Sequence, residues 1–297
     1  MKKSLIFFVA AASVLLSIGF LLSQQDFSKV QIKARKVTDN IYMLQGSGGN
    51  IGVSVGPDGI LMIDDQYAPL APKIEAALKD LSSGSLKYVL NTHFHGDHTG
   101  GNEVFGKSST IVAHANVRKR LSTEQMRRGQ PAPPKPREAW PVITFDTSIS
   151  VHFNGEEIRA MHYPQAHTDG DAVIYFVNSN VVHMGDTFFA GIFPYIDIES
   201  GGSVQGLIAA VGHVIENVPA DVKLIPGHGE LSTLDDLKAY HDMLQQTSAL
   251  VEQKIADGKT LETIKAEGLP GQWQVWANGF INEEGWLEAL YNSLQKM

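Results

Sequence analysis

The sequence has no cysteine among its 297 residues. This absence excludes a disulfide framework, a metal site built on thiolates and the attachment of a lipid to an N-terminal cysteine. Any metal ion would therefore have to be bound by His, Asp or Glu side chains.

Basic residues are also scarce, with 24 Lys and Arg against 32 Asp and Glu, which gives a formal net charge of -8. A protein that binds a nucleic-acid backbone needs a basic face that releases counterions. The charge therefore argues against nucleic acid, and we expect a small-molecule substrate. With 43% hydrophobic and 19% charged residues, the composition is that of a globular protein.

Long apolar runs are absent except at the N-terminus, where Met1-Lys2-Lys3 precedes an almost wholly apolar stretch from Leu5 to Leu22. This pattern is typical of a secretory signal or a membrane anchor. We expect residues 1–23 to be a signal peptide cleaved near Ser23, and an uncleaved anchor is the alternative. The protein is then exported, either to the periplasm or into the medium, and residues 30–297 form a single domain.

Apolar periodicity divides the chain into two similar halves, each with β segments followed by helices. In the first half it predicts strands at 41–44, 51–55, 60–63, 86–90 and 110–113 and helices at 71–81 and 116–121. In the second half it predicts strands at 149–153, 158–162, 172–177, 181–184 and 223–225 and helices at 204–215, 234–256 and 285–294. The pattern suggests an α/β protein in which two sheets pack face to face with helices outside, a four-layer αββα sandwich.

Three histidines and a carboxylate lie within six residues of one another, directly after the strand predicted at 86–90. They are His93, His95, Asp97 and His98. If the extended conformation persists, His93 and His95 project to the same side and can share one ion. Asp97 is placed to cap a helix from about His98 to Phe105, so that Asp97 and His98 face a second ion. Imidazole and carboxylate at this density indicate a metal site.

This His-x-His-x-Asp-His pattern resembles the signature of the metallo-β-lactamase superfamily. Three later residues match the remaining ligand motifs in the same chain order, namely His167 in Ala-His-Thr-Asp-Gly-Asp, Asp186 in His-Met-Gly-Asp-Thr and His228 in Pro-Gly-His-Gly. Each is expected just before or just beyond a predicted strand. The resemblance covers roughly residues 37 to 230, and it implies the αββα topology with the ligand loops gathered at one edge.

The resemblance also implies two zinc ions. The first would be held by His93, His95 and His167, and the second by Asp97, His98 and His228. Asp186 would bridge the ions or bind mainly the second. Open coordination positions mark a catalytic site, in which the cations lower the pKa of water toward neutrality. Iron or manganese could replace zinc, because His/Asp sites accept several metals. We expect Asp97 to orient the attacking water and to carry a proton to the leaving group.

Two positions depart from the best-known zinc β-lactamases. Asp186 stands where those enzymes have a cysteine, and Phe189 stands where they have a lysine that holds the substrate carboxylate. The sequence therefore predicts an exported dinuclear-zinc hydrolase that opens a carbonyl-containing ring or an ester or amide bond, with β-lactamase-like activity as the most testable case. A lactonase or thioesterase of the same superfamily is the alternative, and a non-catalytic zinc-binding or redox protein is the alternative of another class.

Other residues support less specific expectations. Residues 123–141 form either a solvated connection or a lid, in which Trp140 would offer an aromatic wall and the arginines would bind substrate anions. An apolar pocket or the core would take Phe94, Phe188, Phe189, Phe193 and Tyr195. Because metal-bound imidazoles usually donate their second N–H to an acceptor, we expect supporting contacts from a further set of residues, namely Asp64, Asp65, His162, Asp169, Asp171 and His183.

Overall fold

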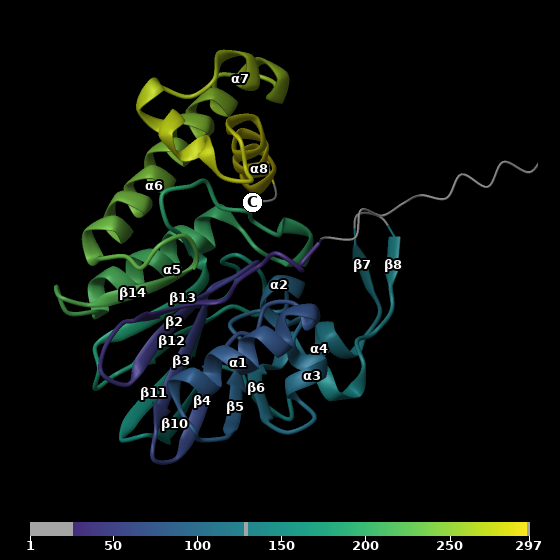
Figure 1. Ribbon diagram of the computed structural model, residues 1–297. Helices are drawn as coiled ribbons and strands as arrows, with labels where there is room; N and C mark the ends of the chain where they lie inside the picture. Colours follow the sequence, from purple (N-terminus) through teal and green to yellow (C-terminus); the bar gives the residue numbers. More distant parts are fainter. Residues whose placement is uncertain (1–25, 128–129, 296–297) are drawn as a thin grey trace, which may run out of the picture.

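The computed structural model describes residues 26–127 and 130–295 (Figure 1). The signal or anchor expected at residues 1–23 lies outside these residues. Within them, no helix is both long enough and apolar enough to cross a membrane.

The first sheet has seven strands in the order β1-β2-β3-β4-β5-β6-β9. Its antiparallel part, β1 to β4, contains the three strands predicted at 41–44, 51–55 and 60–63 and one strand, β1, that was not predicted, whereas β5, β6 and β9 are added in parallel. The strand bounds are β1 Lys33–Lys36, β2 Ile41–Gln45, β3 Ile51–Gly56, β4 Gly59–Ile63, β5 Leu86–Leu90, β6 Thr110–His114 and β9 Ile143–Phe145.

The second sheet has five strands in the order β10-β11-β12-β13-β14. The first four are antiparallel neighbours, and β14 lies parallel to β13. The bounds are β10 Ser148–Phe153, β11 Glu156–His162, β12 Ala172–Phe176, β13 Val181–Phe189 and β14 Lys223–His228.

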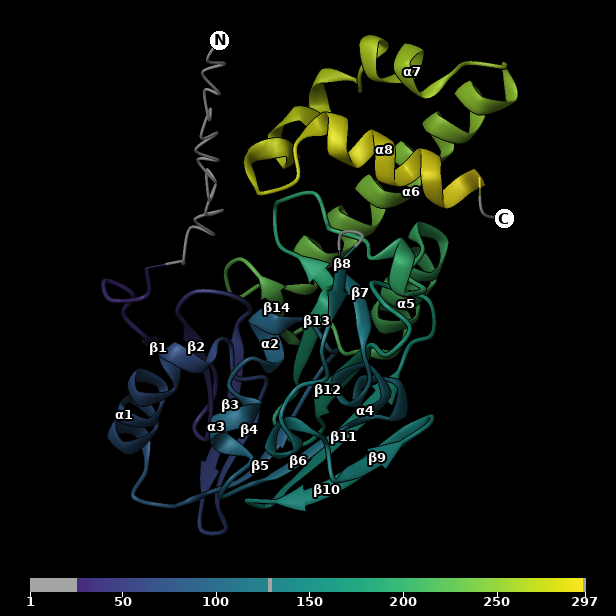
Figure 2. The ribbon, with the colours of Figure 1, turned by 90° about the vertical axis from the view of Figure 1, so that its right-hand side faces the viewer.

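Helices cover the outer face of each sheet. The α-helices are α1 Ala71–Leu81, α2 Gly96–Thr99, α3 Asn102–Phe105, α4 Ala115–Ser122, α5 Val204–Asn217, α6 Leu234–Ala256, α7 Leu261–Glu267 and α8 Glu283–Gln295. Short 3-10 helices occupy Ala68–Leu70 (η1), Arg137–Ala139 (η2), Ile198–Ser200 (η3) and Gly271–Asn278 (η4). Figure 2 shows α1 outside the first sheet, α5 outside the second, and α7 and α8 beyond the ends of the strands.

Buried apolar side chains form one layer between the sheets and one under each set of helices. The middle layer joins both sheets through residues such as Ile63, Leu90 and Ile174. The outer layers lie between the first sheet and α1 and between the second sheet and helices α5, α6 and α8. The predicted αββα sandwich is therefore confirmed, because burial on both faces of each sheet requires four layers.

Three local predictions differ from the structure. The helix expected from His98 to Phe105 is two short turns, α2 and α3, separated by Gly100-Gly101, and α2 begins at Gly96 with His95 as its N-cap. Asp97 therefore lies inside the first turn and does not cap it. The segment 123–141 contains a two-stranded hairpin, β7 Gln125–Arg127 and β8 Gln130–Ala132, followed by η2.

Candidate metal centre

Four segments that meet at one edge of the sandwich bring the predicted ligands together: the loop and short helix after β5, the loop after β11, strand β13 and the end of β14. Three imidazoles converge from two of these loops: His93 Nε2 and His95 Nδ1 are 3.2 Å apart, and His167 Nε2 lies 2.9 Å from His95 Nδ1. We call His93, His95 and His167 the three-histidine cluster. The expected pairing of His93 with His95 is therefore present, although the chain there is a loop beyond β5.

A second group forms beside it from α2 and the end of β14. Asp97 Oδ2 lies 3.3 Å from His228 Nε2 and 3.7 Å from His98 Nε2. We call Asp97, His98 and His228 the Asp97 cluster. In each group, counting Asp186 with the three histidines, the potential ligand atoms all lie within 4.8 Å of one another.

Asp186 faces both clusters with different oxygens. Its Oδ2 lies 3.5 Å from His167 Nε2 and 3.8 Å from His93 Nε2. Its Oδ1 lies 3.0 Å from His98 Nε2 and 3.4 Å from His228 Nε2. The carboxylate thus lies between the two clusters, with one oxygen toward each.

The backbone of β13 aims Asp186 at this position. The sequence predicts that the strand ends before Asp186, but β13 continues to Phe189 and carries the aspartate inside it. Its register against β14 shifts on both sides of Gly185, which has a φ of +50°. Such irregularities re-aim side chains next to active sites. A Cβ on Gly185 would lie 2.6 Å from Thr92 Cβ, so this close approach requires glycine.

The second ring nitrogen of four imidazoles is held by the protein. His98 Nδ1 lies 2.7 Å from Asp64 Oδ2, and His95 Nε2 lies 2.9 Å from Asp197 Oδ2. His167 Nδ1 donates to the carbonyl of Tyr195 at 2.8 Å. In the neutral ring, an acceptor at one nitrogen favours the tautomer whose opposite nitrogen has no proton, as a metal ligand requires.

The fourth held imidazole is reached through a hydroxyl. Thr92 Oγ1 donates to Asp64 Oδ2 at 2.7 Å, and the same oxygen lies 3.0 Å from His93 Nδ1. Because the hydroxyl proton is used on Asp64, the oxygen accepts from His93 Nδ1–H, which leaves Nε2 as a lone pair. Asp64 therefore supports one imidazole in each cluster.

The segment that carries Asp64 is strained. Asp64 and Gln66 are fully buried and have φ values of +61° and +56°, a region that costs non-glycine residues energy and that often occurs at functional sites. Contacts on each side hold the segment: Asp65 Oδ1 accepts from Gly101 N at 2.8 Å, and Gln66 Nε2 donates to the Gly49 carbonyl at 2.8 Å.

The atoms that face the centre fit cations. The three lone pairs of the three-histidine cluster point at a common place with no proton left between them. In the other group, His98 Nε2 and Asp186 Oδ1 are buried 3.0 Å apart and have no other hydrogen-bond partner, so that either a proton or a cation must lie between them. Buried polar atoms are normally paired, and a cation shared by such atoms satisfies them together. The nitrogen and oxygen donor set suits zinc and several other divalent metals.

The clusters differ in protonation when no metal is bound. Burial lowers the pKa of His167 to about 4 and holds that of His93 well below its usual value. Burial acts in the same direction on His228, but the charges of Asp186 and Asp97 outweigh it and raise the pKa of His228 to about 9. The pKa of His98 is raised as well, because the same carboxylates and Asp64 outweigh its burial.

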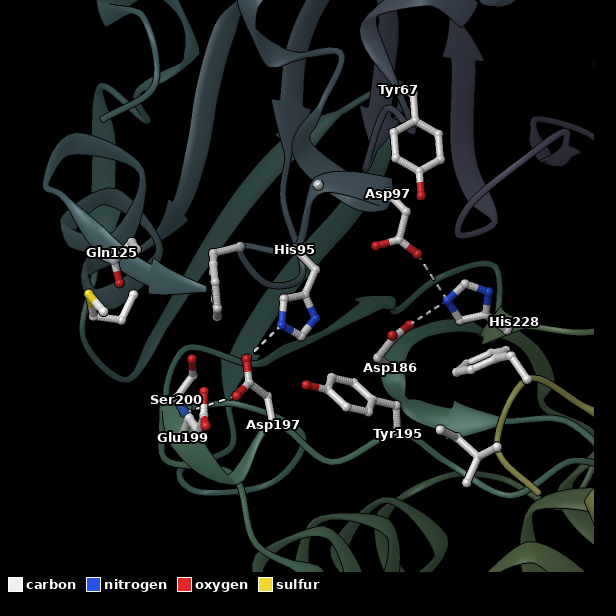
Figure 3. A pocket seen from close by; sticks show the side chains of 15 residues that line it. Tyr67, His95, Asp97, Gln125, Asp186, Tyr195, Asp197, Glu199, Ser200 and His228 are labelled. Carbon is white, nitrogen blue, oxygen red and sulfur yellow. Dashed lines mark hydrogen bonds and ion pairs between the residues drawn. The ribbon is translucent and has the colours of Figure 1, made fainter. Parts of the chain in front are cut away.

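A cavity of about 710 Å³ opens over both clusters. Figure 3 shows Tyr67 beside Asp97 and His228 at one end, and Asp197, Glu199 and Gln125 at the other. The lining residues are Tyr67, Phe94, His95, Gly96, Asp97, Gln125, Met126, Asp186, Tyr195, Asp197, Glu199, Ser200, His228, Phe280 and Ile281. The volume suits a small-molecule substrate.

The aromatic residues divide between cavity and core. Phe94 and Tyr195 line the cavity, whereas Phe188, Phe189 and Phe193 are fully buried. Trp140 is not part of the cavity wall, and its indole donates to the Lys135 carbonyl at 2.9 Å while its ring packs on the small cluster around Phe94.

Most of the expected supporting residues act one step further away. His183 accepts from Gly185 N, next to Asp186, and His162 contacts the Asp171 carbonyl. Asp171 accepts from the backbone and hydroxyl of Thr168, and Asp169 pairs with Arg120. Among the described residues of that set, Asp64 is the one that contacts an imidazole of the metal centre.

Sequence reasoning missed Thr92, Asp197 and Phe280. Thr92 lies directly before His93, and a hydroxyl in the motif itself was the available signal. Asp197 belongs to the loop between β13 and η3, and Phe280 follows η4, so both reach the site only through tertiary structure. Phe280 lies 5.6 Å from His228, ring centre to ring centre.

Comparison with known proteins agrees with this geometry. The family model described as "Metallo-beta-lactamase superfamily" matches residues 39–256. The "Probable hydroxyacylglutathione hydrolase glo2" of Schizosaccharomyces pombe is 30% identical over 202 residues, which are 63% of this chain and 67% of that protein. The "Hydroxyacylglutathione hydrolase" of Pelagibacter ubique is 30% identical over 190 residues, 60% of this chain and 67% of that protein.

Solved structures show the same fold at lower identity. The "Metallo-beta-lactamase from Pontibacter korlensis" has a TM-score of 0.60 and 16% identity, and the match covers 72% of this chain and 99% of that one.

Proposed function

The chain belongs to the metallo-β-lactamase superfamily of metal-dependent hydrolases, and we propose that within it the protein hydrolyses thioesters or closely related esters. The observation that carries the proposal is the convergence of seven His and Asp side chains at the floor of a substrate-sized cavity. The curated relatives at 30% identity are named as hydroxyacylglutathione hydrolases, which favours a thioester over a lactam.

We propose that the cofactors are two divalent cations, zinc by preference. The three-histidine cluster would hold one, the Asp97 cluster the other, and Asp186 would contact both. When bound, the cations would polarise the acyl carbonyl and lower the pKa of a water between them. In the overall reaction, the water oxygen bonds to the acyl carbon, the carbon–sulfur bond breaks and a proton passes to the leaving thiolate.

The role of Asp97 in this proposal is to orient water and to carry that proton. Its carboxylate faces the cavity (Figure 3), and the side chain is 24% exposed, so it can contact both the water and the leaving group. Asp97→Asn keeps an oxygen that can bind metal but loses the base. We expect the variant to keep substantial metal and to lose most of its kcat. A parallel loss of metal and activity would show that Asp97 acts only as a ligand.

The β-lactam reading of the sequence has less support than its thioesterase alternative. Phe189, which stands where the best-known zinc β-lactamases have a substrate-binding lysine, is fully buried and stacks on the His228 ring with a centroid distance of 5.3 Å. It cannot bind a lactam carboxylate, and the structural likeness to a named metallo-β-lactamase concerns the fold.

The test is a substrate panel assayed with the metal-loaded protein, with and without a chelator. The acetyl thioester of N-acetylcysteamine, an acyl homoserine lactone and nitrocefin represent the thioester, lactone and lactam classes. We expect chelator-sensitive turnover that is fastest for the thioester or the lactone. Turnover of nitrocefin alone would restore the β-lactamase reading, and no chelator-sensitive turnover of any substrate would favour a binding or redox protein.

Export stays a separate proposal. It is supported by Met1-Lys2-Lys3 and the apolar stretch that follows, and it does not depend on the chemistry of the site. N-terminal sequencing of the protein from the periplasm or the medium tests it: we expect mature chains that begin near residue 24. Full-length protein confined to the cytoplasm would contradict it.

A further inference from the structure

The walls of the cavity have an unusual charge. Among the fifteen described residues that line it, four are acids, namely Asp97, Asp186, Asp197 and Glu199, and none is Lys or Arg. Asp97 and Asp186 belong to the metal-binding groups, and Asp197 contacts His95. Glu199 is exposed and forms no ion pair with any residue in the described part of the chain. Its negative charge is therefore available to a substrate.

The remaining walls are apolar and exposed. Of seven large hydrophobic side chains exposed in residues 26–127 and 130–295, three line this cavity: Met126 at 63%, Phe280 at 60% and Tyr195 at 44%. Met126 comes from β7, Tyr195 from the loop after β13, and Phe280 from the segment after η4. Exposed apolar side chains that gather at one place mark a binding surface.

Phe280 is held in position from behind. Its ring lies 5.8 Å from Phe189 and 5.6 Å from His228, centroid to centroid, which leaves its free face to the cavity. Two contacts fix the segment that carries it: Phe193 N donates to the Trp276 carbonyl at 2.8 Å, and a Cβ on Gly279 would lie 2.8 Å from Ile192. This wall belongs to residues beyond 256, outside the part that matches the family model.

We propose that the site is selective for esters or thioesters whose acyl and leaving groups are apolar and either uncharged or cationic, and that Phe280 and Glu199 determine this selectivity. The inference rests on the proposed function and narrows its substrate. Phe280 contacts the apolar group, and Glu199 attracts a cation or repels a carboxylate. Glutathione carries two carboxylates, so the substrate named for the relatives is predicted to be a poor one here.

The test uses one acyl group on four thiols. Octanoyl thioesters of N-acetylcysteamine (neutral), thiocholine (cationic), 3-mercaptopropionate (anionic) and glutathione are assayed with the metal-loaded full chain by release of the free thiol. We expect kcat/KM for the neutral and cationic thioesters to exceed that for the anionic ones by about 3-fold or more, since a charge contact made by an exposed side chain changes binding by a factor of this size.

Two pairs of variants separate the proposal from a general effect of substitution. Glu199→Gln should lower the ratio of cationic to neutral kcat/KM about 3-fold or more. Glu284→Gln, which changes an exposed acid on α8 that does not line the cavity, should leave that ratio unchanged. Phe280→Ala should raise KM for the octanoyl thioester more than for the acetyl thioester, whereas Val275→Ala, equally exposed at 60% but outside the cavity, should not.

Binding of the corresponding non-hydrolysable octyl thioethers, measured by calorimetry, gives a readout that does not depend on turnover. The same charge order is expected there. A preference for the anionic thioesters, or variants that behave like their controls, would overturn the selectivity while leaving the hydrolase intact. Absence of turnover on every ester and thioester, with metal bound, would instead overturn the proposed function and this inference with it.

Discussion

The two ligand clusters are built differently, although Asp186 joins them. In the three-histidine cluster, every imidazole has its second nitrogen held by the chain, through Thr92, Asp197 or the Tyr195 carbonyl. In the Asp97 cluster, the structure gives such support only for His98, through Asp64. Asp97 and His228 are 24% and 17% exposed and face the cavity.

From this difference we expect the three-histidine cluster mainly to hold a metal ion and the Asp97 cluster to use its ion in catalysis. Ligands whose second nitrogen is fixed lose little freedom when an ion binds, so the three-histidine cluster should bind more tightly. The Asp97 cluster has fewer fixed ligands and contacts the substrate space directly. It should exchange its ion more readily. An equal loss of metal affinity should lower catalysis more in the Asp97 cluster than in the three-histidine cluster.

The largest effect is expected from Asp186→Asn, because Asp186 is the residue that both clusters share. The amide keeps one oxygen but presents an N–H to the other cluster, which repels a cation. We expect kcat/KM to fall by about 1000-fold or more and metal content to fall below one equivalent. Metal analysis and the thioester assay measure both. Asp221→Asn, which changes an exposed side chain bonded to Asn180, is the control, and full metal content in Asp186→Asn would refute a shared ligand.

Variants that lack one ligand of one cluster should show whether the two clusters differ in metal affinity. His167→Ala removes a buried ligand from the three-histidine cluster, and His228→Ala removes a partly exposed one from the Asp97 cluster. After dialysis against a weak chelator, we expect His228→Ala to keep about one equivalent of metal and His167→Ala to keep clearly less, because the tighter site is the one damaged. Equal retention in the two variants would show that the clusters do not differ in affinity.

The supporting carboxylates should give a smaller effect. Asp64 contacts His98 directly and reaches His93 through Thr92, whereas among the proposed ligands Asp197 contacts His95 alone. Loss of such a partner typically weakens metal affinity about 10- to 100-fold. We expect Asp64→Asn to weaken both ions and to lower thermal stability, since Asp64 is fully buried. Asp197→Asn should weaken only the tighter ion. If Asp197→Asn affected both ions equally, the assignment of Asp197 to a single cluster would be wrong.

The sequence alone predicts the ligands that lie close together in the chain. His93, His95, Asp97 and His98 stand next to one another after a clear strand, and the apolar periodicity of β2 to β5 and α1 is strong enough to place them. The strand around Asp186 was predicted too short because the Gly185 irregularity interrupts the pattern that signals a strand. The bend is set by the approach of Thr92, which sequence does not show.

The supporting residues were harder to predict because they act through space. Asp197 and Tyr195 lie in a loop without periodicity, and the useful atom of Tyr195 for His167 is a backbone carbonyl, which has no sequence signature. The Phe280 wall follows a 3-10 helix that no apolar pattern indicates. The ligands can therefore be predicted from the sequence, whereas the difference between the two clusters depends on the tertiary structure around those ligands.

The pH dependence of metal binding reports most directly on the difference between the two clusters. At pH 7 in the metal-free protein, the lowered pKa values of His93 and of His167, about 4, leave both rings neutral. The raised pKa of His228, about 9, and that of His98 keep those rings charged. The pairing of the His228 imidazolium with Asp186 and Asp97 stabilises the metal-free fold below pH 6.5, and that contribution is lost as pH rises through about 9.

A cation must displace those protons from the Asp97 cluster but not from the three-histidine cluster. Between pH 7 and 9 we therefore expect the affinity for the second ion to rise by up to about 10-fold per pH unit for each proton released, while the first ion changes little. Calorimetric titration in buffers of different ionisation enthalpy counts the protons, and His228→Ala should release fewer with the second ion than the parent protein. Equal proton release for both ions would show that the clusters share one electrostatic environment. The difference between the three-histidine cluster and the Asp97 cluster would then rest on their hydrogen bonds alone.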